Sequence, residues 1–206
     1  MEETFVQGSS LGQLLDLTTG GKPQSRAHAT MLAVLALAAG LVLSAIWGAA
    51  AGSSSASLAI ANLYKVPMVI LLSAITALPV GLVTLRLTNA KLAGTELASA
   101  FATSIFGGTL ILATLAPLVA IYYHTSEKAG VPLAIGSVFV ALATASILFA
   151  RAVARRLEGQ RGASLLAVVI LVAVFLAALL QFVALASPII GVHGTALEYG
   201  FDGLHL

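Results

Sequence analysis

The residues that could carry chemistry in this chain are few, and they lie at the ends of its apolar stretches. Four histidines could bind a haem iron or the metal of a pigment, because imidazole is a common metal ligand. They are His28, His124, His193 and His205. A b-type haem within a membrane needs a histidine pair at mid-membrane depth, and these four lie at membrane edges or in the tail. We expect no metal site. The cofactor stays open, since one edge histidine could bind a pigment or lie at the interface.

Catalytic groups are also missing from the apolar stretches. The chain has no cysteine, no HExxH zinc motif, no GxSxG nucleophile motif and no Walker glycine loop. No Asp, Glu, Lys or Arg occupies the centre of an apolar stretch, whereas ion-coupled transporters, proton relays and voltage sensors depend on such groups. We therefore expect no catalytic residue and predict that the chain is not an enzyme.

The composition is that of an integral membrane protein. Of 206 residues, 59% are hydrophobic and 9% are charged, against roughly 25% charged in an average soluble domain. Five uncharged stretches are long enough to cross a bilayer at roughly 1.5 Å per residue. They cover residues 29–51, 66–85, 97–123, 131–150 and 164–190. We predict an all-α fold, a bundle of five transmembrane helices.

Two of the five stretches carry features that predict local structure. Within residues 62–87, Pro79 removes a hydrogen bond to the carbonyl of Ile75, so a kink is expected beside neighbouring helices, with Ser73 or Thr76 as nearby hydroxyl donors. Pro67 is expected in the first turn of this span, and residues 58–64 could form an interfacial helix that leads into it. Trp47 near the end of the first stretch suits the water interface.

The arrangement of positive charge predicts an orientation. Eight of the ten lysines and arginines fall on one side of a five-span bundle, and Lys65 and Lys128 fall on the other. The cytoplasmic side carries this excess, which places the N-terminus in the cytoplasm and the C-terminus outside. Arg151, Arg155, Arg156 and Arg161 are the predicted topology anchors, binding anionic headgroups or an acidic partner.

Three regions follow from this layout. Residues 1–28 form a cytoplasmic segment that lacks the basic start and apolar core of a signal peptide, and it is predicted to be retained with a short interfacial helix. Residues 29–190 form the five-span domain. Residues 191–206 form an outer polar tail.

Small residues on the spans predict close helix contacts. Gly48 and Gly52 are four apart, and Ser104, Gly107 and Gly108 make the third span thin on one side. Small residues let backbones approach closely in a membrane. They either pack the spans of this chain together or bind a partner.

Part of the chain resembles bacterial membrane proteins of the Yip family. The resemblance covers about residues 58–121 and includes Lys65-Val66-Pro67, Pro79, the G-T-E-L-A run at 94–98 and Ala116-Pro117. It implies a five-helix bundle and a role in organising membranes, and it carries over no catalytic residue. Together with the composition, it predicts an integral protein of the bacterial inner membrane.

Three functional classes remain. The first is a noncatalytic subunit or scaffold of a larger membrane assembly, with the lipid bilayer and other membrane proteins as partners. The second is a Yip-like membrane-organising factor, and the third is a pore or carrier for a neutral or apolar solute. No nucleic acid partner is predicted.

Overall fold

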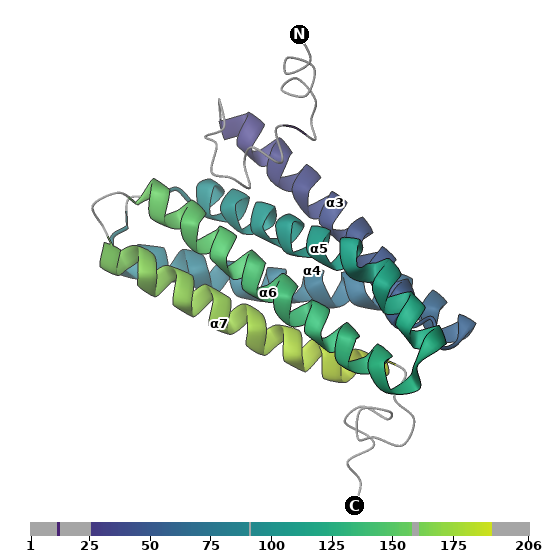
Figure 1. Cartoon of the computed structure of the whole chain (residues 1–206). Helices are drawn as coiled ribbons and strands as arrows, with labels where there is room; N and C mark the ends of the chain where they lie inside the picture. The colour runs from purple at the N-terminus through teal and green to yellow at the C-terminus, as the bar shows by residue number, and fades with distance from the viewer. Residues whose placement is uncertain (1–11, 13–25, 91, 158–160, 191–206) are drawn as a thin grey trace, which may run out of the picture.

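The computed structural model of the chain describes residue 12 and residues 26–90, 92–157 and 161–190. These residues form long helices that run alternately in opposite directions (Figure 1). The helices are α3 (Arg26–Ala51), α4 (Ala56–Leu87), α5 (Gly94–Thr125), α6 (Glu127–Arg156) and α7 (Arg161–Ala186). All five are long and apolar enough to cross a membrane. The predicted all-α membrane bundle of five spans is confirmed. Apart from Gly12, the predicted N-terminal interfacial helix lies outside the described residues, as does the tail 191–206.

The ends of α4 follow from local chemistry. Ser55 is in an extended conformation, and its hydroxyl accepts a hydrogen bond from the Leu58 N–H at 3.2 Å, which caps the helix. From there α4 runs unbroken past Pro67. Residues 58–64, expected to form an interfacial helix leading into this span, are part of α4 itself. The prediction that Pro67 lies in the first turn was wrong, because it lies in the helix interior. Beyond the other end, Asn89 takes a left-handed conformation with φ 49°, which asparagine tolerates better than most residues.

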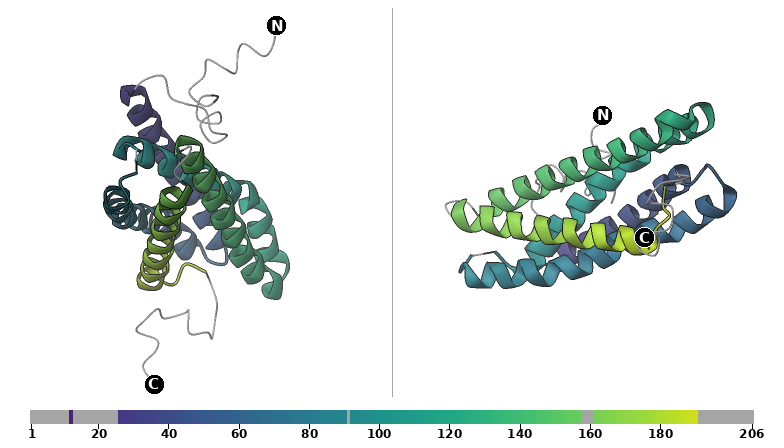
Figure 2. Two further views of the ribbon diagram at one scale, coloured as in Figure 1. Left: turned by 90° about the vertical axis from the view of Figure 1, so that its left-hand side faces the viewer. Right: turned by 90° about the horizontal axis from the view of Figure 1, so that it is seen from below.

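The helices pack in an order that differs from their order in the chain. α3 lies between α4 and α5, α6 packs on the far side of α5, and α7 packs on the far side of α4. α6 and α7 contact each other much less (Figure 2). The bundle is therefore a curved row, α6, α5, α3, α4, α7, whose two end helices meet only loosely.

The first half of α5 forms the centre of the bundle. Every residue from Ser99 to Thr109 is buried. Hydroxyls on this stretch donate to carbonyls one turn back, for example Thr103 to Ser99 at 2.9 Å and Ser104 to Phe101 at 2.7 Å. These donors are satisfied within their own helix, and of this stretch only the Ser99 hydroxyl has no partner among the described residues. Most of the surface that α5 presents therefore packs like an apolar one.

Pro79 does not lie against protein, and that prediction was wrong. Its side chain is exposed on the same face of α4 as Ile75 and Leu82, and α4 packs chiefly on α3 and α7 rather than on α5. The Ser73 hydroxyl donates to the Val69 carbonyl at 2.7 Å instead of reaching Ile75. The pyrrolidine ring is apolar, so it fits a lipid-facing surface.

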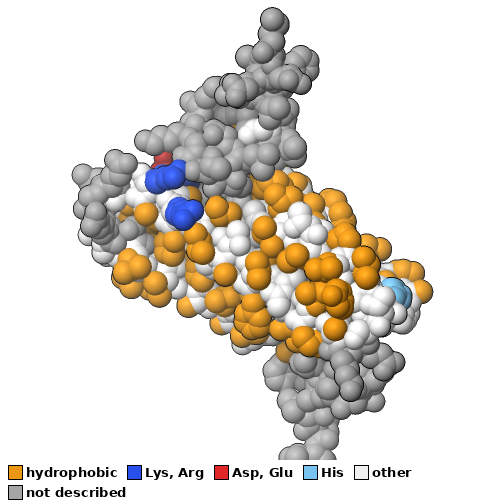
Figure 3. Space-filling model, viewed as in Figure 1, with side chains coloured by type: hydrophobic (Ala, Val, Ile, Leu, Met, Phe, Trp, Pro, Cys, Tyr) orange, Lys and Arg blue, Asp and Glu red, His pale blue; other side chains and the backbone are white. Residues whose placement is uncertain are grey.

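The two ends of the bundle differ in charge. At the end where α4 and α6 finish and α5 and α7 begin, Arg151 and Arg155 are exposed, and Arg156 donates to the backbone carbonyl of Glu96. Arg161 is the first residue of α7 at the same end. We call this the arginine end, and the opposite end, where Trp47 lies, the tryptophan end. Figure 3 shows the charged side chains gathered at one end, with apolar side chains spread over the rest of this face. That the arginine end is cytoplasmic stays a prediction.

Candidate functional site

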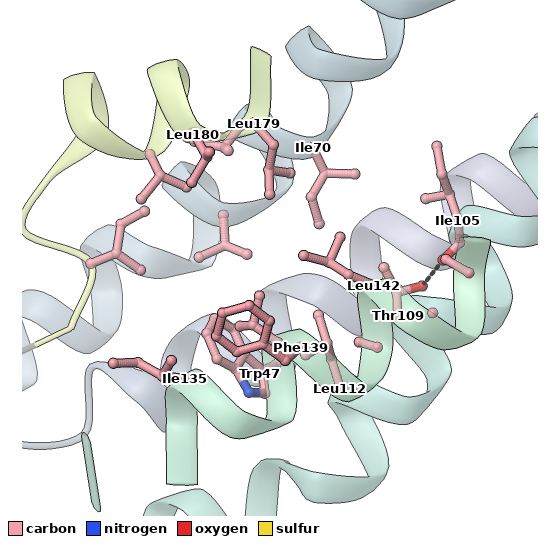
Figure 4. Close-up of a pocket in the computed structure, with 18 of the residues that line it drawn as sticks. Trp47, Ile70, Ile105, Thr109, Leu112, Ile135, Phe139, Leu142, Leu179 and Leu180 are labelled. Atoms are coloured by element: carbon pink, nitrogen blue, oxygen red, sulfur yellow. Dashed lines mark hydrogen bonds between the residues drawn. The ribbon is translucent and has the colours of Figure 1, made fainter. Parts of the chain in front are cut away.

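The main cavity of the described bundle has a volume of about 350 Å³ and touches all five helices (Figure 4). It lies toward the tryptophan end. Its lining side chains are almost all aliphatic or aromatic. They are Trp47 from α3; Val66, Val69 and Ile70 from α4; Ile105, Gly108, Thr109 and Leu112 from α5; Ile135, Val138, Phe139, Ala141, Leu142 and Ala145 from α6; Phe175, Leu179, Leu180 and Val183 from α7; and Ser187, Ile189 and Ile190 beyond it.

The polar side chains that line this cavity already have hydrogen-bond partners. The Trp47 indole N–H donates to the Ser137 hydroxyl at 2.9 Å, and that hydroxyl donates to the Ala134 carbonyl at 2.7 Å. The Thr109 hydroxyl donates to the Ile105 carbonyl at 3.0 Å (Figure 4). A water molecule needs two to four polar partners to occupy a buried site. The cavity is therefore suited to an apolar molecule rather than to water.

Aromatic rings close the cavity toward the arginine end. The Phe101 ring meets the Phe149 ring edge to face at a centroid distance of 5.6 Å, and the Phe175 ring at 5.4 Å. These three residues come from α5, α6 and α7, and Phe175 also lines the cavity. Edge-to-face pairs at this spacing are favourable. The aromatic cluster thus forms a floor between the cavity and the arginine end.

The segment after α7 closes the tryptophan end. Asn62, with 0% of its surface exposed, donates from Nδ2 to the Ile189 carbonyl at 2.6 Å. Lys65, three residues later, donates from Nζ to the Pro188 carbonyl at 3.3 Å. We call residues 187–190 the cap segment. It is held over the cavity by two neighbouring polar side chains on one face of α4.

The side of the cavity between α6 and α7 faces the outside of the bundle. Phe139 of α6 and Leu180 of α7 line the cavity, yet 68% and 69% of their surfaces are exposed. The two helices that carry them pack only loosely on each other. Phe139 and Leu180 therefore form a wall of the cavity that is also exposed on the outside of the bundle.

The predicted small residues lie at helix contacts within the chain. A Cβ at Gly48 would lie 2.5 Å from the Asn62 carbonyl oxygen, and one at Gly52 would lie 2.8 Å from the Ala59 nitrogen. These two glycines let α3 and α4 approach closely at the tryptophan end. They also leave the space in which the Asn62 side chain sits.

The three small residues of α5 are buried as well. A Cβ at Gly107 would meet Leu148 Cδ1 at 2.4 Å, and one at Gly108 would meet Ala145 Cβ at 2.9 Å, both on α6. Ser104 is 3% exposed. Of the predicted small residues, only Gly108 lines the main cavity. A partner could reach this surface only by displacing α6, so the geometry favours packing within the chain.

Three polar residues of the site were missed by sequence reasoning. Trp47 is buried rather than facing the headgroups, and its indole is bonded to Ser137. Asn62 and Lys65 were not recognised as the residues that hold the cap segment. Their signal was their three-residue spacing just before an uncharged stretch, which places both side chains on one helix face.

The histidines stay apart in the described structure. His28 lies in the first turn of α3 and His124 in the last turn of α5, at opposite ends of the bundle. His193 and His205 lie outside the described residues. Within the described residues there is no group of three or more His, Cys, Asp or Glu side chains.

Comparison with protein-family models, with curated proteins and with solved structures finds no match. What the chain itself establishes is its class. Five apolar helices make it a multi-span membrane protein that contacts the lipid bilayer.

Proposed function

We propose that this chain is a noncatalytic integral membrane protein that binds an apolar molecule taken from the bilayer. The observation that carries the proposal is the apolar cavity, which is lined by residues of five helices and bordered by Phe139 of α6 and Leu180 of α7, two side chains that are exposed on the outside of the bundle. Its size falls at the lower end of the roughly 300–1,000 Å³ found for ligand pockets. This corresponds to the predicted carrier for an apolar solute, with binding as its first step.

Two features of the lining support binding rather than a reaction or ion transport. No described side chain that lines the cavity is ionisable, whereas proton and ion pathways in membranes use such groups. The hydroxyl and indole donors at its wall are already bonded to protein acceptors. The lining therefore offers contact area without offering a nucleophile, an acid or a base.

The test uses Trp47 as an internal reporter, because it is the single tryptophan of the chain and lines the cavity. A brominated lipid chain quenches indole fluorescence on contact. We expect a dibrominated fatty alcohol, added to protein purified in mild detergent, to quench Trp47 saturably. Lipid extraction and mass spectrometry of the same preparation would identify any molecule that co-purifies.

A matched pair of variants on α6 provides the control. Val138 lines the cavity, and Val140, two residues away, is exposed on the outside of the bundle. Val138→Phe should fill the cavity and abolish saturable quenching, whereas Val140→Phe should leave it unchanged. Equal quenching in both variants would show that the alcohol reaches Trp47 without occupying the cavity, and the proposal would fail.

A role as a subunit or scaffold of a larger assembly is the second proposal, and Gln181 favours it. This amide lies on the exposed side of α7, the most apolar span, and no hydrogen bond joins it to another described residue. Side-chain amides in membranes gain by bonding across to another helix. We expect the protein, extracted gently, to migrate as a complex that Gln181→Leu makes smaller. A lone monomer before the substitution would contradict the subunit role.

The Yip-like proposal concerns membrane organisation and rests on the sequence resemblance over residues 58–121. It is compatible with lipid binding, because a protein that takes up lipid chains changes the bilayer around it. Its test is the shape of vesicles that contain the purified chain. Unchanged vesicle diameter and morphology at high protein density would argue against it.

A further inference from the structure

The rim of the cavity at the tryptophan end carries a cation, Lys65. The next residue, Val66, lines the cavity, and the Lys65 ammonium lies 3.3 Å from the carbonyl of Pro188. The neighbours of that proline, Ser187 and Ile189, line the cavity too. Lys65 is therefore at the boundary between the apolar cavity and the end of the bundle.

The contacts of Lys65 leave room for an anion. A lysine ammonium has three N–H donors, and the described structure gives one acceptor, a neutral backbone carbonyl. The described part of the chain supplies no carboxylate within ion-pair distance of Lys65. A partly buried charge is costly unless it is paired, so an anionic group at this position would stabilise the ammonium more than the carbonyl alone does.

The two ends of the cavity differ in polarity. Phe101, Phe149 and Phe175 close one end. The other end has Lys65 and the buried Asn62, whose side-chain oxygen has no hydrogen-bond partner among the described residues. A molecule that matches this gradient has an apolar chain pointing toward the phenyl rings and a polar head at the cap segment.

The volume of the cavity limits the length of the ligand's alkyl chain. A cavity of roughly 150 Å³ holds benzene, with its six carbon atoms, so about 350 Å³ has room for roughly fourteen carbon atoms by the same scale. The lining residues of α7 run from Phe175 to Val183, a rise of roughly 12 Å at 1.5 Å per residue. One alkyl chain fits this space, and two side by side do not.

We propose that the cavity binds a single-chain amphiphile whose anionic headgroup, a carboxylate or a phosphate, pairs with Lys65. This inference rests on the proposed function, because it assigns a ligand class to the same cavity. The alkyl chain of this ligand enters between Phe139 and Leu180. Its headgroup stays at the tryptophan end, where the membrane boundary keeps it hydrated.

The experiment compares ligands that share one chain and differ in the head. A dibrominated fatty acid, with its carboxyl ionised at alkaline pH, should quench Trp47 at a concentration about tenfold lower than the matching fatty alcohol, as expected for one charge-assisted hydrogen bond. Lys65→Gln should remove this difference and keep alcohol binding, which also shows that the variant is folded. Lys65→Arg should preserve most of the difference.

Two controls separate the headgroup from other sources of charge. Arg86→Gln removes a cation from the other end of α4 and should leave the preference unchanged. A lysophosphatidic acid without bromine should compete with the fatty acid, whereas inorganic phosphate at the same concentration should not. Competition by inorganic phosphate would mean that Lys65 belongs to a site for a free anion, and would overturn the amphiphile inference.

The failures are distinguishable. Equal affinity for acid and alcohol, or an unchanged preference in Lys65→Gln, would overturn the headgroup inference while cavity binding stands. Unchanged quenching by both ligands in Val138→Phe would overturn cavity binding itself, and the headgroup inference with it.

Discussion

The two halves of the bundle are built from the same helices but are packed differently. Toward the arginine end, α5, α6 and α7 contribute Phe101, Phe149 and Phe175, whose edge-to-face contacts leave a pocket of only about 20 Å³. Toward the tryptophan end, α5 and α6 contribute Gly108 and Ala141 to the lining of an unfilled volume of about 350 Å³. The difference is one of side-chain volume.

In a membrane this difference has more consequence than in water. Lipid tails are as apolar as leucine, so little hydrophobic drive holds helices together, and association depends on van der Waals packing and interhelical hydrogen bonds. The half toward the arginine end, with its three phenylalanines, has that packing. The half toward the tryptophan end lacks part of it, because side chains around the cavity have no neighbours on one side. We infer that the first half stabilises the bundle and leaves the second half available for a ligand.

The largest expected effect comes from truncating the aromatic cluster. Phe149 is 1% exposed, and Phe149→Ala should lower the free energy of unfolding by about 3–5 kcal/mol. Val138→Ala, on the same helix but beside the existing cavity, should cost less than about 1.5 kcal/mol, because Val138 already lacks neighbours on one side. SDS titration in mixed micelles measures both.

Similar decreases in the free energy of unfolding for Val138→Ala and Phe149→Ala would show that the two halves of the bundle are packed equally well. That result would mean that the cavity is filled, by repacked side chains or by a tightly held molecule. Repeating the titration after delipidation would separate these two causes.

The next largest effect concerns two adjacent glycines of α5. A Cβ at Gly108 would lie 2.9 Å from Ala145 Cβ and 3.0 Å from the Ala141 oxygen, neither of which can turn away. Gly108→Ala should therefore push α6 outward at a cost of about 1–3 kcal/mol. Gly107→Ala would meet only the flexible end of Leu148, so it should be nearly neutral. The same titration compares them.

Disulfide trapping provides an independent measurement, since the chain has no native cysteine. Cysteines placed at Leu112 and Ala141, which both line the cavity, should form a disulfide more slowly in Gly108→Ala than in Gly107→Ala. Equal rates would show that α6 does not move, and the close α5–α6 contact would then lose its importance for the shape of the cavity.

The number of spans was predictable because length and composition alone determine it. The order of packing was not. In a soluble protein a polar face shows which side of a helix is exposed, but here Val69 is buried and Ile75 is exposed although their chemistry is the same. For that reason Pro79 was expected to face protein and instead faces outward.

The cavity was beyond sequence reasoning for a related reason. The size of the cavity depends on the distances between all five helices. Gly48 and Gly108 determine how closely two of the helix pairs approach, but no local sequence pattern predicts the other distances. Trp47 was assigned to the interface by residue type, but its partner Ser137 is ninety positions away in the chain. Polar residues just before a span, Asn62 and Lys65, were the available signal for the cap segment.

A smaller effect on stability is expected at the cap segment, which closes the cavity at the tryptophan end. Asn62→Leu removes the donor to the Ile189 carbonyl, which lowers the free energy of unfolding. It also removes a buried side-chain oxygen that has no partner, which partly offsets that loss, so the net decrease should be about 1 kcal/mol. A cysteine introduced at Ile189, which is buried, should react faster with a maleimide in Asn62→Leu than in a protein that keeps Asn62. A cysteine at the exposed Leu185 should react equally in both, and equal rates at Ile189 would show that Asn62 does not hold the cap segment.

The smallest expected effect is a gain in stability, at Gly136 on α6. An added Cβ there would meet no atom within 4 Å, so Gly136→Ala has no steric cost. A helix-interior glycine is destabilising by roughly 0.5–1 kcal/mol relative to alanine, because glycine has more conformational freedom to lose. Gly136→Ala should therefore raise the free energy of unfolding by up to about that amount and leave Trp47 quenching unchanged. This outcome would contrast with Gly108→Ala, the same substitution at a close helix contact. A loss of stability in Gly136→Ala would instead indicate that another molecule, such as a partner helix, packs on this side of α6 when the protein is in its membrane.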